Sequence, residues 1–215
     1  MSDEFAALRE EYSRAGLSEG DLTPEPIALF RRWFEEVRPL PEPNAMVLAT
    51  VASDGRPSAR AVLLKGLDER GFLFYTNLTS RKGRDLAGHP DCALLFPWHP
   101  LQRQVRVEGR AEPLPRSEAA AYFATRPRDS QLGAWASPQS TVVADRAELD
   151  SRLAEVTERF PADAPVPVPP HWGGYRVVPV AWEFWAGRAG RLHDRLRYVR
   201  PAGSTGPWTR DRLAP

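Results

Sequence analysis

Much of the chain from residue 45 to residue 113, and again from 174 to 199, consists of short apolar, β-branched or aromatic segments separated by turns. The first pair shows it most clearly, because segments 45–51 and 58–67 flank the turn sequence Ser53-Asp54-Gly55-Arg56. Turns this short join antiparallel neighbours, whereas parallel strands need crossovers of roughly a dozen residues or more. The pattern therefore predicts a mainly β fold, an antiparallel sheet that closes into a barrel with peripheral helices.

The remaining elements follow from hydrophobic spacing and turn residues. Further strands are expected at 72–77, 92–98, 102–113, 174–185 and 191–199, and helices at 4–15, 26–37, 80–88, 117–126 and 145–160. Thr23, Ser80 and Ser117 stand where N-caps are expected, because their hydroxyls can accept hydrogen bonds from free backbone N–H groups.

The division of the chain follows from where these elements lie. Prolines at 39, 41 and 43 impose an extended linker before the first strand. We therefore expect an N-terminal helical segment and linker over residues 1–44, and a barrel over residues 45–215 that makes the chain a single domain overall. In the longest helix, Leu149, Leu153 and Val156 share one face and are expected to pack inward.

Bulk composition narrows the class of protein. The chain has 215 residues, enough to bury a substantial core, and its net charge of +1 gives no general attraction to nucleic acid or membranes. No apolar run approaches the length of a membrane-spanning helix, and the acidic start is unlike a signal peptide. The single cysteine, Cys92, lies in an apolar run and is expected to be a buried structural thiol. A reducing, cytoplasmic location fits these features.

Two segments carry cations where an anion could bind. Arg60 and Lys65 fall on opposite faces of one expected strand, which indicates either two anion sites or two ends that reach solvent. Arg81 and Lys82 follow Ser80 in the first turn of a helix, where cations oppose the helix dipole unless an anion sits there. The segment favours a phosphate site over a solvated helix end.

A second set of polar residues fits another phosphate. Tyr122 and Arg126 lie four residues apart on one helix face, and Ser130 follows shortly after. A phenol, a guanidinium and a hydroxyl that converge can hold a phosphate. Gln104 carries a donor and an acceptor that could contact a ring edge, although a polar edge strand is the plain alternative.

The segment Arg191-Leu192-His193-Asp194-Arg195 is the densest cluster of charge. In an extended strand Arg191, His193 and Arg195 point to one face, which could hold a planar anionic ligand or could be a solvated edge. Asp194 points to the other face, where a structural salt bridge is expected. The other histidines, at 89, 99 and 171, lack metal-like spacing with cysteine or acidic residues, so no metal site is expected.

Taken in order, these segments resemble the pyridoxamine 5'-phosphate oxidase family. The resemblance covers nearly the whole chain, from about Leu8 to Pro215, and includes an N-terminal segment that can close over the site. Its matching stretches are RAVLLK (60–65), GFLFYTN (71–77), SRK (80–82), RQVRVEG (103–109), YFATRP (122–127), SQLGAWASPQS (130–140), PPHWGGYRV (169–177), EFW (183–185), RLHDR (191–195) and WTRDRLAP (208–215).

The resemblance implies an FMN-binding split barrel that is a homodimer with FMN at the subunit interface. It implies that FMN is held by Arg60, Ala61, Val62, Leu63, Leu64, Lys65, Tyr75, Thr76, Arg81, Lys82, Gln104, Gln139, Ser140, Trp185 and Arg195, some of them from the partner chain. It implies that substrate is bound by Arg9, Tyr12, Lys65, Tyr122, Arg126, Ser130, Arg191, Leu192 and His193, with Arg191 and His193 as the catalytic pair.

The implied activity is oxidation of pyridoxamine or pyridoxine 5'-phosphate to pyridoxal 5'-phosphate, with oxygen as acceptor and hydrogen peroxide as product. Two alternatives remain at this point. One is a flavin- or vitamer-binding split-barrel protein without turnover; a pure flavin carrier would not need Tyr122, Arg126, Ser130, Arg191 or His193, which are all present. The other is a phenazine-pathway flavin oxidase, which would be expected to lose part of the substrate-phosphate set that is intact here.

Overall fold

The computed structural model describes Tyr12 and residues 16–215. The expected helix over residues 4–15, apart from Tyr12, lies outside the described residues. Arg9, expected to contact substrate, also lies outside them.

A nine-stranded sheet forms the body of the molecule, with the order β2-β1-β5-β6-β7-β4-β3; in addition, β8 pairs with β7, and β9 pairs with β8. All its paired strands are antiparallel. The predicted antiparallel split barrel is therefore confirmed. The strands are β1 (Ala45–Val51), β2 (Pro57–Leu63), β3 (Gly66–Asp68), β4 (Gly71–Asn77), β5 (Asp91–Trp98), β6 (Arg103–Pro113), β7 (Trp172–Ala186), β8 (Asp194–Val199) and β9 (Thr209–Leu213).

Strand β7 connects the two ends of the sheet. Its first residues, from Trp172 to Val177, pair with β4, whereas its last residues, from Ala181 to Ala186, pair with β8. Strand β6 runs beside most of its length, with one bulge at Glu108 and Gly109. A strand this long lets one element border two separate regions of the surface.

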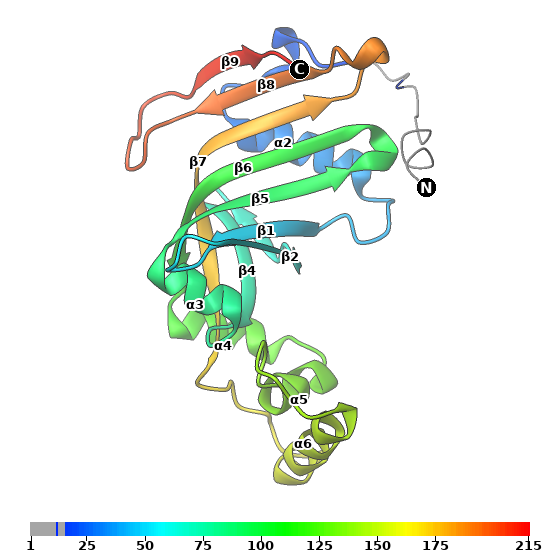
Figure 1. Ribbon diagram of the computed structural model, residues 1–215, viewed down its shortest axis with the longest axis vertical. Coiled ribbons are helices and arrows are strands. Elements are labelled where there is room, and N and C mark those ends of the chain that lie inside the picture. The colour runs from blue at the N-terminus through cyan, green and yellow to red at the C-terminus, as the bar shows by residue number, and fades with distance from the viewer. Residues whose placement is uncertain (1–11, 13–15) are drawn as a thin grey trace.

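Helices cover the barrel and extend from one end of it. They are α2 (Pro26–Val37), α3 (Arg81–Gly88), α4 (Arg116–Ala124), α5 (Arg128–Ala136) and α6 (Arg146–Arg159), with short 3-10 turns η1 (Glu19–Asp21), η2 (His99–Leu101) and η3 (Ala189–Arg191). Figure 1 shows α5 and α6 at the end of the molecule opposite to β8 and β9. The sequence predicts α2 and α3 within one residue, but it merges α4 with the loop after it and misses α5.

The core is aromatic and lies between α2 and the sheet. Phe30 of α2 is 1% exposed, and its ring centroid lies 5.2, 5.0 and 5.9 Å from those of Phe72, Phe96 and Trp182. Burial of such rings contributes about 1.5–3 kcal/mol each. This packing fixes α2 on the barrel, so the helix from the N-terminal segment and the barrel share one core.

Of the three residues expected to be N-caps, only one caps a helix. The Ser80 hydroxyl accepts a hydrogen bond from the backbone N–H of Gly83 at 3.3 Å and caps α3, as predicted. Ser117 is wrong as a cap because α4 begins one residue earlier, after Pro115. Thr23 is also wrong, since Glu25 is the N-cap of α2 and the Thr23 hydroxyl instead donates to the Glu25 carbonyl.

Three other expectations need correction. The strand expected over 58–67 breaks at Leu64 and Lys65, so β2 and β3 are separate strands. Helix α6 buries no residue, and Leu153 is 39% exposed rather than packed inward. Cys92 is half-buried, and burial raises the pKa of its thiol to about 12, in line with a structural role. In the described part of the chain, no helix is long and apolar enough to cross a membrane.

Candidate functional site

A cavity of about 660 Å³ opens between β2, β4, α3 and the α4–α5 region. Trp172, at the start of β7, forms part of its wall. Thirteen of the residues expected to bind FMN or substrate line this cavity: Arg60, Ala61, Val62, Leu63, Lys65, Tyr75, Thr76, Lys82, Tyr122, Arg126, Ser130, Gln139 and Ser140. Segments up to 80 residues apart in the sequence are thus brought to one site, as the resemblance implied.

Lys82 is the most deeply buried cation at the cavity. Its side chain lies in the first turn of α3, is 9% exposed, and donates to the Thr76 hydroxyl at 3.2 Å and the Gln139 side-chain oxygen at 3.0 Å. Burial lowers its pKa, and repulsion from Arg60 adds to the effect. No carboxylate among the described residues forms an ion pair with it. A buried cation that faces another cation is stabilised by a bound anion.

Hydrogen bonds to β1 and β2 fix the Arg60 side chain, which lines the cavity. Its guanidinium donates to the Thr50 hydroxyl at 2.7 Å, the Ser58 hydroxyl at 2.7 Å and the Leu48 carbonyl at 3.1 Å. Asp85 of α3 lies 3.7 Å from it and accepts from Thr50 at 2.7 Å. Burial lowers the pKa of Arg60 more than the Asp85 charge raises it. Arg60 and Lys82 form the first cationic group of the site.

The second cationic group is built on stacked aromatic rings. Tyr75 and Tyr122 stack with centroids 3.9 Å apart, and Tyr75 also stacks on Trp172 at 5.4 Å. The Arg126 guanidinium lies 5.1 Å above the Trp172 ring. One of its terminal nitrogens, Nη1, is buried without a hydrogen-bond partner among the described residues. Since buried donors are nearly always satisfied, this nitrogen marks a place for an acceptor such as phosphate.

Five residues that line the cavity were not predicted from the sequence: Asn77, Gly133, Ala134, Ser137 and Trp172. Trp172 is the aromatic one among them. Its signal was the Trp-Gly-Gly run at the start of β7, because a side chain at Gly174 would come within 2.6 Å of the Tyr75 ring. The glycine leaves the space in which the aromatic stack forms. A tryptophan before paired glycines at the edge of an aromatic cluster could therefore have indicated the platform.

The positions of Arg60 and Lys65 differ from the expectation of one anion site on each strand face. Both residues line the same cavity. The reason is that β2 ends at Leu63, so the chain turns before Lys65 and the alternation of faces no longer applies. Leu64 and Arg81, both expected to contact FMN, are not among the lining residues; Leu64 is 8% exposed and its carbonyl accepts from Asn44.

A second group of expected site residues lies at the far end of β7. The rings of Tyr12, Trp185 and His193 meet edge-on or tilted, with centroids 4.8–5.7 Å apart. Gln104 of β6 is the direct neighbour of Trp185 in the sheet. Arg195 pairs with the buried carboxylate of Glu183 at 2.8 Å. Hydrogen bonding to Glu183 raises the pKa of Arg195, so this arginine stays charged.

The extended segment predicted for 191–199 is wrong at its beginning. β8 starts at Asp194, and Arg191 and Leu192 precede it in a tight turn that includes η3. Arg191 has a φ of 60° and follows Gly190 at 65°. A left-handed non-glycine residue costs about 1–2 kcal/mol. Arg191, His193 and Arg195 therefore do not alternate along one strand face, although His193 still meets Trp185.

The two groups are separate within one chain. Trp172 at the cavity and Trp185 beside His193 are thirteen residues apart on β7, or roughly 40 Å along the strand at about 3.3 Å per residue. The cavity has cations for anions and stacked rings, whereas the far group has the histidine and the strained arginine. Within the described residues, no group of three or more His, Cys, Asp or Glu side chains is placed to hold a metal ion.

Comparisons with known proteins decide the family. Residues 34–160 match the family described as pyridoxamine 5'-phosphate oxidase, and residues 172–215 match the pyridoxine 5'-phosphate oxidase C-terminal dimerisation region. The chain belongs to the pyridoxine/pyridoxamine 5'-phosphate oxidase family. The dimerisation match covers β7, β8 and β9, the part of the sheet that carries the second group of site residues.

Relatives in this family span the same length as the chain. It is 59% identical to the pyridoxine/pyridoxamine 5'-phosphate oxidase of Burkholderia multivorans, over 98% of the chain and 99% of the relative. It is 58% identical to the enzyme of that name from a Nocardioides species, over 99% and 98%. The solved structure of PhzG from Burkholderia lata, in complex with tetrahydrophenazine-1-carboxylic acid, has a TM-score of 0.85 at 36% identity, with 96% and 100% coverage.

The expectation of FMN is confirmed by the family, and the cavity fits that cofactor. FMN carries a phosphate, and Arg60 and Lys82 supply two cations whose pKa values burial lowers; of the two, only Arg60 pairs with a carboxylate of the described residues, that of Asp85. The Thr76 and Gln139 side chains provide polar groups beside them. Membership of this family makes the chain an FMN-dependent oxidase.

Proposed function

We propose that the chain oxidises pyridoxamine 5'-phosphate and pyridoxine 5'-phosphate to pyridoxal 5'-phosphate, with oxygen as electron acceptor. Pyridoxine phosphate and oxygen give pyridoxal phosphate and hydrogen peroxide. Pyridoxamine phosphate, oxygen and water give the same two products and ammonia. Bound FMN supplies the two-electron acceptor for this chemistry. The observation that carries the proposal is the presence of two cationic groups in one cavity, Arg60 with Lys82 and Arg126 with its aromatic platform.

Two anion sites suit a phosphate-bearing substrate beside a phosphate-bearing cofactor. Arg60, Lys82 and the capped start of α3 would hold the FMN phosphate, since helix N-termini and buried cations favour anions. Tyr122, Arg126 and Ser130 would hold the substrate phosphate. That phosphate is remote from the carbon that reacts, so its binding energy can align the ring.

We propose that the site is completed across a homodimer. The matched dimerisation region carries Trp185, His193 and Arg195, which one chain keeps far from its own cavity. A second chain could bring its Arg191 and His193 to the first chain's cavity. Arg191 would then orient the substrate ring, and His193 would contact the substrate or move a proton near C4'.

The relationship to PhzG supports a second candidate, an oxidation in phenazine formation. PhzG has 36% identity and the same fold over almost the whole chain. A substrate that carries a carboxylate instead of a phosphate needs fewer donors than Tyr122, Arg126 and Ser130 supply together. The complete phosphate set therefore favours the vitamer substrates.

The deciding experiment is anaerobic. Pyridoxamine 5'-phosphate added to the yellow protein should bleach the flavin absorbance near neutral pH, and air should restore the colour with release of pyridoxal 5'-phosphate. Unphosphorylated pyridoxamine serves as the matched control and should bleach the flavin far more slowly. Failure to bleach with the phosphorylated vitamer, in protein that has its full flavin, contradicts the proposal. Faster bleaching by tetrahydrophenazine-1-carboxylic acid would favour the second candidate.

A further inference from the structure

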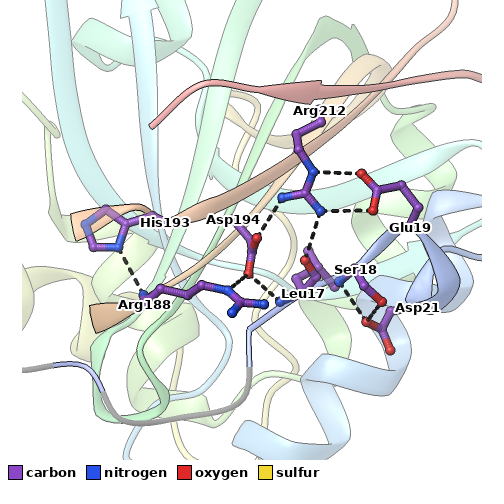
Figure 2. A network of polar contacts seen from close by, with 8 residues as sticks. All are labelled: Leu17, Ser18, Glu19, Asp21, Arg188, His193, Asp194 and Arg212. Atoms are coloured by element: carbon purple, nitrogen blue, oxygen red, sulfur yellow. Dashed lines mark hydrogen bonds and ion pairs between the residues drawn. The ribbon is translucent and has the colours of Figure 1, made fainter. Parts of the chain in front are cut away.

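A buried carboxylate lies directly beside the turn that carries Arg191 and His193. Asp194 is 6% exposed and accepts three hydrogen bonds: from the Leu17 backbone N–H at 2.8 Å, from Arg188 Nε at 2.5 Å and from Arg212 Nη1 at 2.6 Å. Burial alone raises the pKa of Asp194, but these three donors outweigh it and lower the pKa below its usual value. Figure 2 shows the three donors converging on this one side chain.

Arg188 connects this carboxylate to the histidine. Its side chain pairs with Asp194, while its own backbone N–H donates to Nδ1 of His193 at 3.1 Å (Figure 2). A backbone N–H can only donate, so Nδ1 accepts and the neutral ring carries its proton on Nε2. The segment between these two contacts contains Gly190 and Arg191, both in the left-handed region. The turn is therefore closed at both ends.

The other two donors tie the turn to distant parts of the chain. Arg212 of β9 also donates to Glu19 at 2.7 and 3.0 Å, and this pairing lowers the pKa of Glu19 to about 2. Gly16 lies so close to the ion pair that a Cβ there would fall 2.1 Å from Asp194 Oδ2 and 2.3 Å from Arg188 Nε. The chain at residues 16–19 and the last strand thus both pack on the Asp194 pair.

We propose that Asp194 is a positioning residue for the oxidation: through Arg188 it holds the turn that presents Arg191 and His193, and through Leu17 and Arg212 it fastens that turn to the N-terminal segment and to β9. The inference rests on the proposed function for the chemistry that the turn serves. A strained turn keeps its conformation only when its surroundings determine it, and Asp194 is the group on which the surrounding contacts converge.

The test compares three single substitutions in the FMN-loaded enzyme. Asp194→Asn removes the charge that all three donors share. Arg188→Met cuts the link to the turn but leaves the backbone N–H and the contacts of Asp194 with Leu17 and Arg212. Asp211→Asn is the matched control, because Asp211 pairs with Arg197 at 2.8 Å across the same two strands without touching the turn.

Stopped-flow bleaching by pyridoxamine 5'-phosphate separates positioning from folding. We expect Asp194→Asn and Arg188→Met to slow flavin reduction at least about tenfold, because small misplacements of reacting groups have large effects on rate. The rate of reoxidation by oxygen and the FMN content should stay unchanged, and Asp211→Asn should remain within about twofold of the parent enzyme, as expected for an exposed pair. Unchanged reduction in Arg188→Met overturns the proposal, and so does a loss of flavin that parallels the loss of rate.

A second measurement does not depend on activity. Nitrogen-15 NMR of histidine-labelled enzyme, with His193→Gln to assign the signal, reports which ring nitrogen carries the proton. We expect an Nε2–H ring in the parent and a mixture of tautomers in Arg188→Met. A His193 ring protonated on Nδ1 in the parent enzyme would show that the hydrogen bond from the Arg188 backbone N–H is absent, and would refute the proposal. If the parent enzyme fails to bleach at all, the proposed function fails, and the tautomer measurement alone decides whether Asp194 and Arg188 order the turn.

Discussion

Replacing Lys82 by methionine should affect the apoprotein and FMN binding in different ways. Lys82 is 9% exposed, faces Arg60, and has only neutral hydrogen-bond partners in the part of the chain that the structure describes. Methionine keeps most of the side-chain volume and removes the charge. The apoprotein loses weak hydrogen bonds but no longer has to bury a cation beside another cation, so its free energy of unfolding should stay within about 1 kcal/mol of the parent.

The FMN complex should lose much more. A hydrogen bond between a cation and a phosphate contributes about 1.5–3 kcal/mol, which corresponds to about 10- to 150-fold weaker binding. Fluorescence quenching of FMN measures the dissociation constant, and urea unfolding of the apoprotein measures stability. Arg84→Met is the control, since Arg84 is an exposed cation on the same helix outside the cavity.

The pH dependence of the free energy of unfolding gives an independent check that burial lowers the pKa of Lys82. The pKa of Lys82 is lower in the folded protein than in the unfolded chain, so the unfolded chain binds more protons between the two values. The stability of the parent apoprotein should therefore rise as the pH increases through that interval, and Lys82→Met should remove that part of the rise. FMN affinity equal to that of the parent, or an apoprotein destabilised by more than about 2 kcal/mol, would refute this account of Lys82.

Three further predictions follow from other parts of the structure. Trp172→Leu should raise KM for pyridoxamine 5'-phosphate about 2- to 30-fold, because Arg126 loses its cation–π partner, while the Kd of FMN stays the same; equal KM in steady-state assays would contradict this. The folded-state pKa of Asp194 is lowered, so its stabilisation is complete above about pH 4 and is lost as the pH falls through the folded value; Asp194→Asn should flatten that acid limb in urea titrations. Burial raises the pKa of the Cys92 thiol to about 12, so the native protein should react with a disulfide reagent far more slowly than a free thiol does; labelling as fast as that of free cysteine would contradict this.

The sequence predicts the sheet well because strand segments and tight turns are local features. The positions of strands β1, β4, β5 and β6 along the chain follow from apolar runs and turn residues that lie within a few positions of one another, whereas their order in the sheet does not. The helix α5 is missed because Pro127 reads as a stop after α4, whereas it serves as the N-cap of the next helix. β9 is missed because its residues, from Thr209 to Leu213, are mostly exposed and charged and pair only with β8.

The site is predictable where its residues share a short motif and fails where geometry depends on distant contacts. Arg60 and Lys82 come from local patterns and do meet at one cavity. The conformation of Arg191 does not follow from alternation, because Asp194 and Arg188 close the turn by contacts with residues 16–19 and β9. Trp172 reaches Tyr122 and Arg126 only through the fold. The Trp-Gly-Gly run marks the tryptophan in the sequence, but it does not indicate which distant residues the ring contacts.

Because β7 is long, substitutions at its two ends affect different parts of the proposed site. One end of this strand borders the phosphate cavity and the other carries the ring cluster around His193. In the proposed homodimer, a subunit damaged at Lys82 still contributes a sound His193, and a subunit damaged at His193 still contributes a sound cavity. Two inactive variants, mixed and allowed to exchange subunits, would therefore regain catalysis at one of the two centres in each hybrid pair.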